Sequence, residues 1–245
     1  MGRKWNNIKM KKAASDKARS QNYTKVLRDI MMAVKNGGVE AESNFALKVA
    51  LLKAREFNVP KDNVEKAIKK ASGVDAENWE EASYECYGPE GVAIFIDATT
   101  NNPTRTAGNI RAALNRWSGS MGKEGCLQFI FERKAAFTIS SENIDLDDLT
   151  MLLIDAGAED LEKDEDVILI KGEVENYGSI LNKLEELKIK PIESGLKRLP
   201  LNMKKISVDG YKIFSRLIDI LEADDDVQEV YHNLEWDDAF ENIHN

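Results

Sequence analysis

The feature that most constrains this chain is the way its charges are separated along the sequence. Residues 1–72 contain thirteen lysines and four arginines against three aspartates and four glutamates, a balance of +10. The whole chain of 245 residues carries −9, so the residues after position 72 carry −19. A basic segment joined to an acidic body is typical of proteins that bind polyanions, above all nucleic acids.

The most basic part is an arm over residues 1–22, whose only acid is Asp16. The arm has few apolar side chains, so it cannot offset the entropy of ordering by itself. We interpret it as a flexible arm that orders on a partner, with residues 9–19 as its helical part; an ordinary solvated tail is the alternative. Trp5 lies among cations and amides, an arrangement in which the ring can stack on a base while the charges bind phosphates.

Residues 23–78 are predicted to form a three-helix domain. Apolar residues recur at helical spacing over 23–35, and the following Asn36-Gly37-Gly38 ends that helix because glycine accepts the left-handed conformation. Ser43 is expected to cap the second helix, and Asp62 to begin the third in a capping-box pattern. Three amphipathic helices with short links form a small bundle.

Candidate nucleic-acid contacts come mainly from this basic part of the chain. The third helix carries three lysines on the side away from its apolar residues, which is read equally well as a solvated face. Two arginines further along the chain add a second contact. The complete candidate set is Arg3, Lys4, Trp5, Lys9, Lys11, Lys12, Lys17, Arg19, Lys25, Arg28, Lys66, Lys69, Lys70, Arg105 and Arg111.

After residue 78 the pattern changes to short strands and helices, which predicts two ferredoxin-like α+β domains. Residues 79–134 with 204–245 are expected to form one discontinuous domain, and 135–203 a ferredoxin-like βαββαβ domain inserted into it. The predicted strands are 83–87, 92–98, 127–131, 135–139, 167–170, 192–199 and 227–231. The predicted helices are one that Thr104 or Thr106 caps, 145–156, 174–187 and one following residues 206–208. The acidic runs 159–166 and 222–226 are interpreted as solvated loops.

Two short segments raise the question of a bound anion. Arg105 sits at the start of a predicted helix, where the helix dipole disfavours a cation, so either a bound anion or an ion pair is expected there. The glycine-rich loop 119–125 lacks a phosphate-loop motif, but Lys123 with neighbouring Arg116 can contact phosphate. A hairpin-like loop is the alternative for this segment.

The sequence gives little support for a membrane protein, a metal-binding protein or an enzyme. No run of 18 apolar residues exists, so we expect no membrane span and a cytoplasmic protein. Cys86 and Cys126 are read as free thiols, and with only two histidines no zinc site is expected. We find no catalytic constellation, and we expect neither an enzyme, nor a small-molecule substrate, nor a cofactor.

Six linked motifs resemble those of the YebC family, which includes the mitochondrial translational activator of cytochrome c oxidase. The motifs are K-W-x-N-I-K at residue 4, Gly-Gly after the first helix, V-P-K-D-N-V-E-K-A-I-K-K at 59, Y-G-P-E-G-V-A at 87, T-x-N-P-T-R-T at 100 and D-D-D-V-Q-E-V-Y-H-N at 224. The start Met1-Gly2-Arg3-Lys4-Trp5 is similar to the YeeN-like branch.

The resemblance implies a helical N-terminal domain followed by two α+β domains, one inserted in the other, and no enzymatic activity. It implies either a DNA-binding transcriptional regulator or a factor that acts at the ribosome and helps translation through stretches such as consecutive prolines. From the residues themselves, the lack of a base-reading helix favours structured RNA over specific DNA. A protein-interaction adaptor is the remaining alternative.

Overall fold

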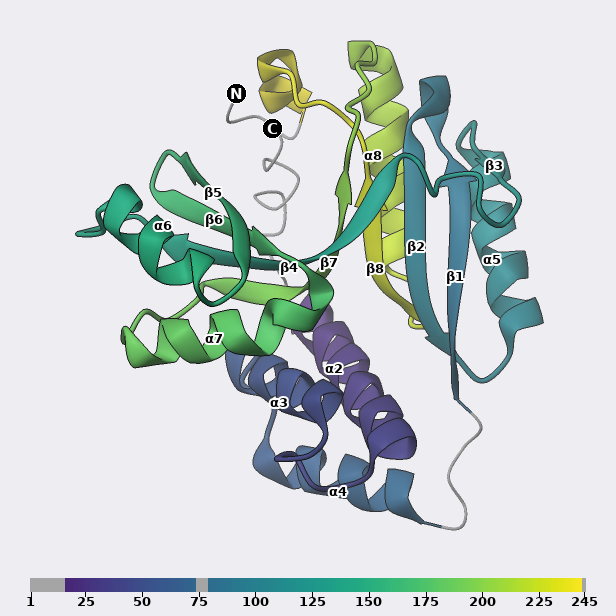
Figure 1. Ribbon diagram of the computed structural model, residues 1–245. Helices are drawn as coiled ribbons and strands as arrows, with labels where there is room; N and C mark the ends of the chain where they lie inside the picture. The colour runs from purple at the N-terminus through teal and green to yellow at the C-terminus, as the bar shows by residue number, and fades with distance from the viewer. Residues whose placement is uncertain (1–15, 74–78, 244–245) are drawn as a thin grey trace. The chain divides into compact units, whose positions relative to one another are not determined.

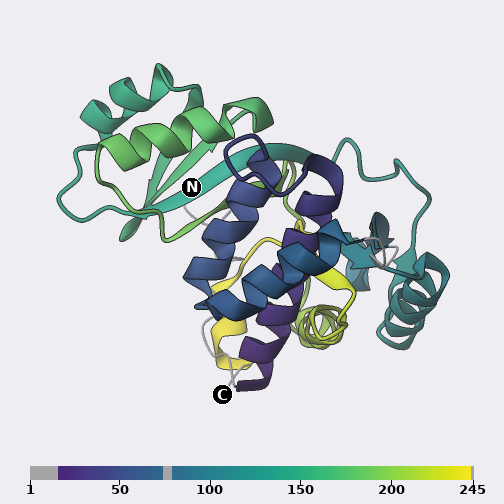
Figure 2. The ribbon, with the colours of Figure 1, turned by 90° about the horizontal axis from the view of Figure 1, so that it is seen from below.

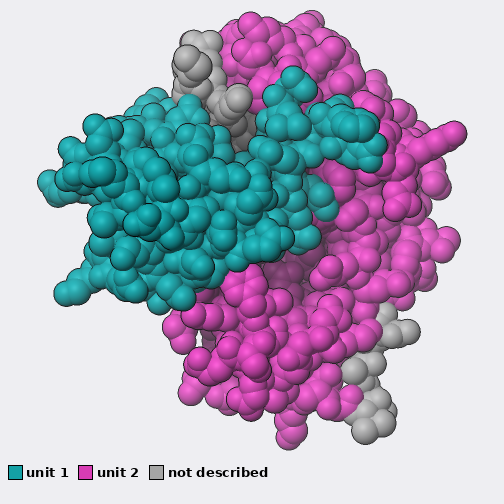
Figure 3. All heavy atoms as spheres, viewed as in Figure 1, with its two compact units in different colours: residues 1–5, 128–202 teal, residues 6–127, 203–245 magenta. Residues whose placement is uncertain are grey.

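The computed structural model describes residues 16–73 and 79–243 (Figure 1). These residues fall into two compact units, one containing residues 128–202 and the other residues up to 127 together with 203–243; Figure 3 colours them separately. Each sheet of the fold lies within one unit. The expected fold class is confirmed: three N-terminal helices precede two four-stranded antiparallel sheets with helices.

The N-terminal helices are α2 (Asp16–Gly37), α3 (Phe45–Glu56) and α4 (Lys61–Ser72). Their apolar sides meet in a small core that includes Val26, Ile30, Leu47 and Ala67. Helix α2 begins seven residues before the predicted start at residue 23, because the helix continues into the segment assigned to the arm. It ends as predicted at the glycine pair, where Gly38 has a φ of +84° and donates its N–H to the Val34 carbonyl at 2.8 Å.

Both predicted N-caps in this domain were wrong. The Oδ1 atom of Asn44, not Ser43, accepts the Leu47 N–H at 3.0 Å, while the Ser43 hydroxyl donates to the Glu40 carbonyl. Asn44 also donates to the carbonyls of Ala33 and Gly38, so one buried amide joins the end of α2 to the start of α3. Helix α4 begins at Lys61 after Pro60, which provides no side-chain cap, and Asp62 lies inside its first turn.

The first sheet has the strand order β3-β1-β2-β8. Its strands are β1 (Glu80–Tyr87), β2 (Ala93–Thr100), β3 (Ser120–Met121) and β8 (Val227–His232), and its helices are α5 (Pro103–Arg116) and α8 (Val208–Glu222). Both helices contribute to one core against this sheet, with Ile94 and Ile96 of β2 packing against Ile110 of α5 and Phe214 and Leu217 of α8. Strand β1 begins three residues before the predicted strand.

The second sheet lies entirely within residues 128–202 and has the order β5-β6-β4-β7. It is built from β4 (Phe131–Ser140), α6 (Leu146–Ile154), β5 (Ala158–Asp164), β6 (Val167–Gly172), α7 (Tyr177–Glu186) and β7 (Glu193–Pro200). Helices α6 and α7 cover one face of this sheet (Figure 2). The succession βαββαβ with two central strands, β6 and β4, is the ferredoxin-like arrangement expected from the sequence.

The structure corrects three strand and loop assignments around this sheet. The strand predicted at 127–131 was wrong, because residues 124–130 form a turn that contains the buried Leu127, and the strand predicted at 135–139 begins earlier, as β4 (Phe131–Ser140). Residues 131–134 therefore belong to the inserted sheet. The acidic run 159–166 is not a solvated loop throughout, because residues 159–164 form most of β5, which pairs with β6.

Candidate nucleic-acid interface

Half of the excess positive charge of the basic segment lies in residues 1–15, outside the described residues. The predicted contacts that fall there are Arg3, Lys4, Trp5, Lys9, Lys11 and Lys12. Lys17 and Arg19 lie within α2, and their side chains are also outside the description. The structure therefore places seven of the fifteen candidates, which are Lys25, Arg28, Lys66, Lys69, Lys70, Arg105 and Arg111.

Three of the placed candidates share one helix, α4. Lys66, Lys69 and Lys70 are all exposed, while Ala67 between them is buried in the helical core. The 3.6-residue period of the helix puts these lysines on the side opposite the core, as predicted. They form a compact cationic surface that can meet phosphate oxygens. A lysine ammonium acts as a point charge and lacks the planar, forked geometry with which arginine recognises phosphate or a base edge, so it favours phosphate contacts over precise base readout.

The two candidates on α2 lie against the acidic turn before β8 instead of facing open solvent. The Lys25 ammonium donates to the Glu222 carbonyl at 3.0 Å. Arg28 donates to the Asp225 carbonyl and to the Asp226 carboxylate, where Nη1 and Oδ1 are 3.3 Å apart. The Arg28 guanidinium also lies 4.4 Å from the centre of the Trp79 ring, a cation–π contact. These contacts join the helical segment to the first sheet.

Two of the arginines predicted to contact nucleic acid, Arg28 and Arg105, both bind the Asp226 carboxylate. Its Oδ2 atom accepts from Arg105 Nη2 at 2.6 Å, from the Thr106 hydroxyl at 2.8 Å and from the Thr100 hydroxyl at 3.2 Å. Its Oδ1 atom accepts from Arg28. The Asp226 side chain is only 6% exposed, so this carboxylate is a buried charge with two guanidinium partners.

The surroundings of Asp226 favour its charged form. Burial alone raises the pKa of a carboxyl group, but the hydrogen bonds from Arg105 and Thr106, with the charges of Arg105 and Arg28, hold the pKa of Asp226 below its usual value. A buried carboxylate is tolerated only when it is paired and hydrogen-bonded. The interpretation of residues 222–226 as wholly solvated was therefore wrong at Asp226, and the cation at the start of α5 takes part in an ion pair.

Helix α5 is capped by Asn102 and not by either predicted threonine. Asn102 Oδ1 accepts the Arg105 N–H at 3.1 Å, whereas Thr106 uses its hydroxyl for Asp226 and Thr100. The last predicted contact, Arg111, is exposed on the same helix, with Nη2 located 3.7 Å from the sulfur of Met121. Arg105 and Arg111 thus have different surroundings, although the sequence analysis grouped them.

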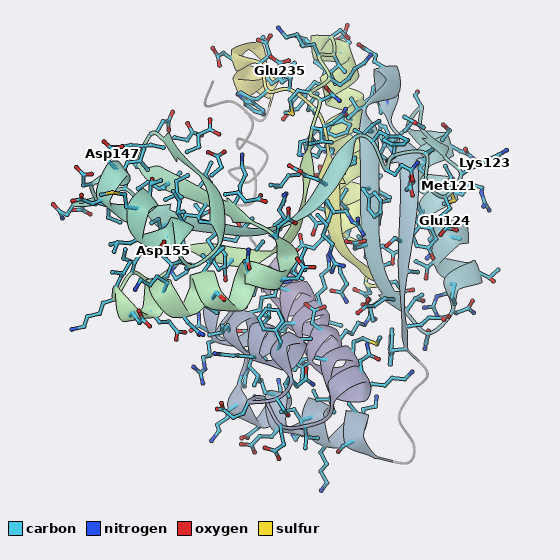
Figure 4. The ribbon with its side chains drawn as sticks, viewed as in Figure 1. Met121, Lys123, Glu124, Asp147, Asp155 and Glu235 are labelled. Atoms are coloured by element: carbon cyan, nitrogen blue, oxygen red, sulfur yellow. The ribbon has the colours of Figure 1, made fainter. Side chains whose placement is uncertain are left out.

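The glycine-rich loop 119–125 does not form a phosphate cradle. Backbone N–H groups in and after it point at the Glu85 carboxylate, which accepts from Gly125 at 2.7 Å and from Leu127 at 2.5 Å. A phosphate there would meet a negative side chain that already occupies the donors. Lys123, by contrast, is exposed at the tip of the loop, and Figure 4 shows its side chain there beside Met121 and Glu124.

Asp226, which binds Arg28 and Arg105, and Trp79, which contacts Arg28, were not predicted from the sequence. The available signal was Arg105 itself, a cation in an unfavourable position that requires a counter-charge, but the sequence does not show which of many acids supplies it. Among the described residues, no group of three or more His, Cys, Asp or Glu side chains is placed to bind a metal ion. No helix in the same part of the chain has the length and apolar character needed to cross a membrane.

Comparison with known proteins places these features in a family. Residues 3–74 match the model of the TACO1/YebC protein N-terminal domain, and residues 79–234 match that of the TACO1/YebC second and third domain. A protein of Clostridium beijerinckii named probable transcriptional regulatory protein is 41% identical over 239 residues, which cover 97% of this chain and 98% of the relative. A Clostridium botulinum protein of the same name is 40% identical over 240 residues, with the same coverage.

A solved structure supports the fold over nearly the whole chain. The crystal structure of a conserved hypothetical protein from Aquifex aeolicus matches with a TM-score of 0.84 and 33% sequence identity. The match covers 94% of this chain and 96% of that protein.

Proposed function

This chain belongs to the TACO1/YebC family, and from that premise we propose that it is a non-enzymatic, nucleic-acid-binding regulator of gene expression. The observation that carries the proposal is the balance of +10 over residues 1–72 on a chain whose total is −9. Relatives of the same length named as transcriptional regulatory proteins support the regulatory role.

The contacts are assigned first to the arm and to α4. The arm supplies Arg3, Lys4, Lys9, Lys11 and Lys12, with Trp5 as a stacking residue, and α4 supplies Lys66, Lys69 and Lys70. Lysines exposed in this way neutralise phosphates and release counterions, which gives affinity with little sequence selectivity. We assign Lys25 and Arg28 a structural role, because their hydrogen bonds to residues 222–226 join the helical segment to the first sheet.

The primary form of the proposal is a DNA-binding transcriptional regulator, as the names of the relatives suggest. One observation favours a second form, a ribosome-associated translation factor that binds ribosomal RNA. The exposed cations of α4 are all lysines, which suit phosphate and shape recognition of structured RNA better than base readout in a DNA groove. Crosslinking in cells followed by identification of the attached nucleic acid separates the two: promoter DNA supports the first form and ribosomal RNA the second.

The proposal is tested by charge reversal in the arm. Lys9→Glu, Lys11→Glu and Lys12→Glu together are expected to abolish binding of the full chain to a short DNA duplex and to an RNA hairpin of equal length. Each neutralised phosphate contributes about −0.9 (duplex DNA) or −0.7 (single strand) to the slope of log affinity against log salt, so the wild-type slope counts the contacts.

The matched control reverses three exposed lysines of the unit containing residues 128–202: Lys163→Glu, Lys188→Glu and Lys190→Glu. This control variant is expected to bind as the wild type does. A wild-type protein that binds neither probe at low salt, or whose binding does not respond to salt, contradicts the proposal. A large fall in the melting temperature of the arm variant would show that the arm lysines are structural.

A further inference from the structure

The acidic body of the chain contains one long segment without any acid. Of the 43 aspartates and glutamates, 36 follow residue 72, yet none lies between Asp97 and Glu124. At the acid frequency of the body, about five would be expected in these 26 residues, which instead carry Arg105, Arg111, Arg116 and Lys123. A segment of this length without acidic side chains indicates a surface that does not repel an anionic ligand.

The structure shows which of these cations are available to a ligand. The segment contains the end of β2, helix α5, the following turn and β3. On α5, Thr106, Ile110 and Leu114 are buried against the sheet. Arg105 is tied to Asp226, and neighbouring Asn109 donates to the Asp224 carboxylate at 3.2 Å. The first half of the exposed side of α5 is therefore engaged with the acidic turn before β8.

The remaining three cations have no acidic partner in the part of the chain that the structure describes. Arg111, Arg116 and Lys123 are exposed. Arg111 contacts the Met121 sulfur, and the Arg116 guanidinium lies 5.9 Å from the centre of the Trp117 ring. Neither contact neutralises a charge. Two arginines and a lysine are thus exposed on an acidic protein without an ion-pair partner among the described residues.

The residues between the two arginines leave room for a ligand to approach. At 100° per residue, Gly108, Ala112 and Asn115 lie between Arg111 and Arg116 around the outside of α5. All three are exposed, and none is bulky or acidic. Small side chains allow a sugar-phosphate backbone to lie close to the helix, and the Asn115 amide can hydrogen-bond to a base edge or a phosphate.

We propose that the outer face of α5 and the loop after β3, with Arg111, Asn115 and Arg116 on the helix and Lys123 on the loop, form a second binding surface for the phosphate backbone of a nucleic acid. The inference rests on the proposed function and adds a contact that does not depend on the N-terminal basic segment. The turn carrying Asp224 and Asp225 lies between α2, which it contacts through Arg28, and α5, which it contacts through Asn109. These acids repel a backbone running directly from α2 to α5, so the second surface takes a separate segment of the nucleic acid.

The test measures salt dependence with the full chain and a short random-sequence DNA duplex, and in parallel with an RNA hairpin of equal length. The variant is Arg111→Gln, Arg116→Gln and Lys123→Gln. Removing three phosphate contacts is expected to lower the log–log salt slope by about 2 to 3. The probe that shows the larger fall identifies which nucleic acid the surface prefers. Arg111→Lys with Arg116→Lys keeps the charges and is expected to keep the slope, which shows that a fall reflects charge and not a folding defect.

The control variant Lys163→Gln, Lys188→Gln and Lys190→Gln has the same change in net charge as the α5 variant and is expected to keep the wild-type slope. If the α5 variant and the control variant are indistinguishable while the arm variant loses binding, the α5 surface is refuted and the proposed function stands. A wild-type chain that binds neither probe refutes both.

Discussion

Two charge clusters of this protein have opposite signs at their centres. In one, the buried acid Asp226 is surrounded by the cations Arg28 and Arg105. In the other, the cation Lys134 of β4, 13% exposed, is surrounded by acids: its Nζ is 2.7 Å from both Glu159 and Glu173 and 4.0 Å from Glu132. One cluster lies in the discontinuous part of the fold and the other in the continuous inserted unit.

The partners differ in how far apart they lie along the chain. Asp226 is 198 residues from Arg28 and 121 from Arg105, whereas Lys134 is 25 residues from Glu159 and 39 from Glu173. The Asp226 cluster is more buried on one side, since Asp226 is 6% and Arg28 12% exposed, although Arg105 is 48% exposed. In the other cluster only Lys134 is buried, and Glu159 and Glu173 are 42% and 53% exposed. The discontinuous part of the fold therefore contains a buried ion pair, Arg28–Asp226, whereas the ion pairs of the continuous sheet are partly solvated.

The largest expected effect comes from Asp226→Asn. The change leaves Arg28, whose side chain is 12% exposed, without its negative partner, and breaking a buried ion pair in this way costs about 3–5 kcal/mol. Urea unfolding at neutral pH measures the loss. Asp225→Asn is the matched control, because only the backbone carbonyl of Asp225 accepts from Arg28, so its expected change stays within about 0.5 kcal/mol. If the two variants had equal free energies of unfolding, the ion pairs of Asp226 would make no measurable contribution to stability.

Acid titration is expected to remove the Asp226 contribution. The pKa of Asp226 is lower in the folded than in the unfolded state, so its stabilisation is complete above the unfolded value of about 3.9 and disappears as the pH falls through the folded value. The free energies of unfolding of wild type and Asp226→Asn should therefore converge as the pH falls below about 4. A constant difference between them would mean that the variant acts through packing instead of charge.

The smallest expected effect comes from Lys134→Gln. Exposed ion pairs contribute only about 0.2–1 kcal/mol each, so the loss is expected near 1 kcal/mol and should shrink in high salt. Hydrogen bonds to Glu159 and Glu173 raise the pKa of Lys134, so its contribution is present below the usual lysine value and disappears as the pH rises through the raised one. Lys163→Gln on β5 is the control. If Lys134→Gln lowered the free energy of unfolding as much as Asp226→Asn does, the two clusters would not differ in their contribution to stability.

The same contrast explains what the sequence reveals of the fold. The helices and most buried strands are predictable because their apolar residues recur at regular spacing, as in α2 and β2. Strand β5 was missed because it carries Glu159, Asp160 and Glu162 and little apolar surface. As an edge strand it pairs only with β6, and Lys134 and Lys171 neutralise its acids. That neutralisation depends on contacts between strands, which a single stretch of sequence does not display.

The candidate site was predictable as a charge pattern but not as a geometry. The sequence identifies the exposed lysines of α4 because helical spacing alone separates them from Ala67 and Val64. It does not separate Arg105 from Arg111, since the two differ only in which side of α5 faces the turn containing Asp226. The caps show the same limit: Asn44 follows Ser43 and Asn102 is two residues before Thr104, and backbone geometry decides which side chain caps the helix.

The insertion between β3 and α8 also has a consequence for biosynthesis. A ribosome makes β1, β2 and α5 early, but β8, which pairs with β2, only after the whole inserted unit. Until the last forty or so residues emerge, the nascent sheet has an open hydrogen-bonding edge at β2, and Arg28 and Arg105 have no Asp226 to bind. The inserted unit needs no later segment for its sheet and can form first, while β2 has its second partner only after β8 has been made.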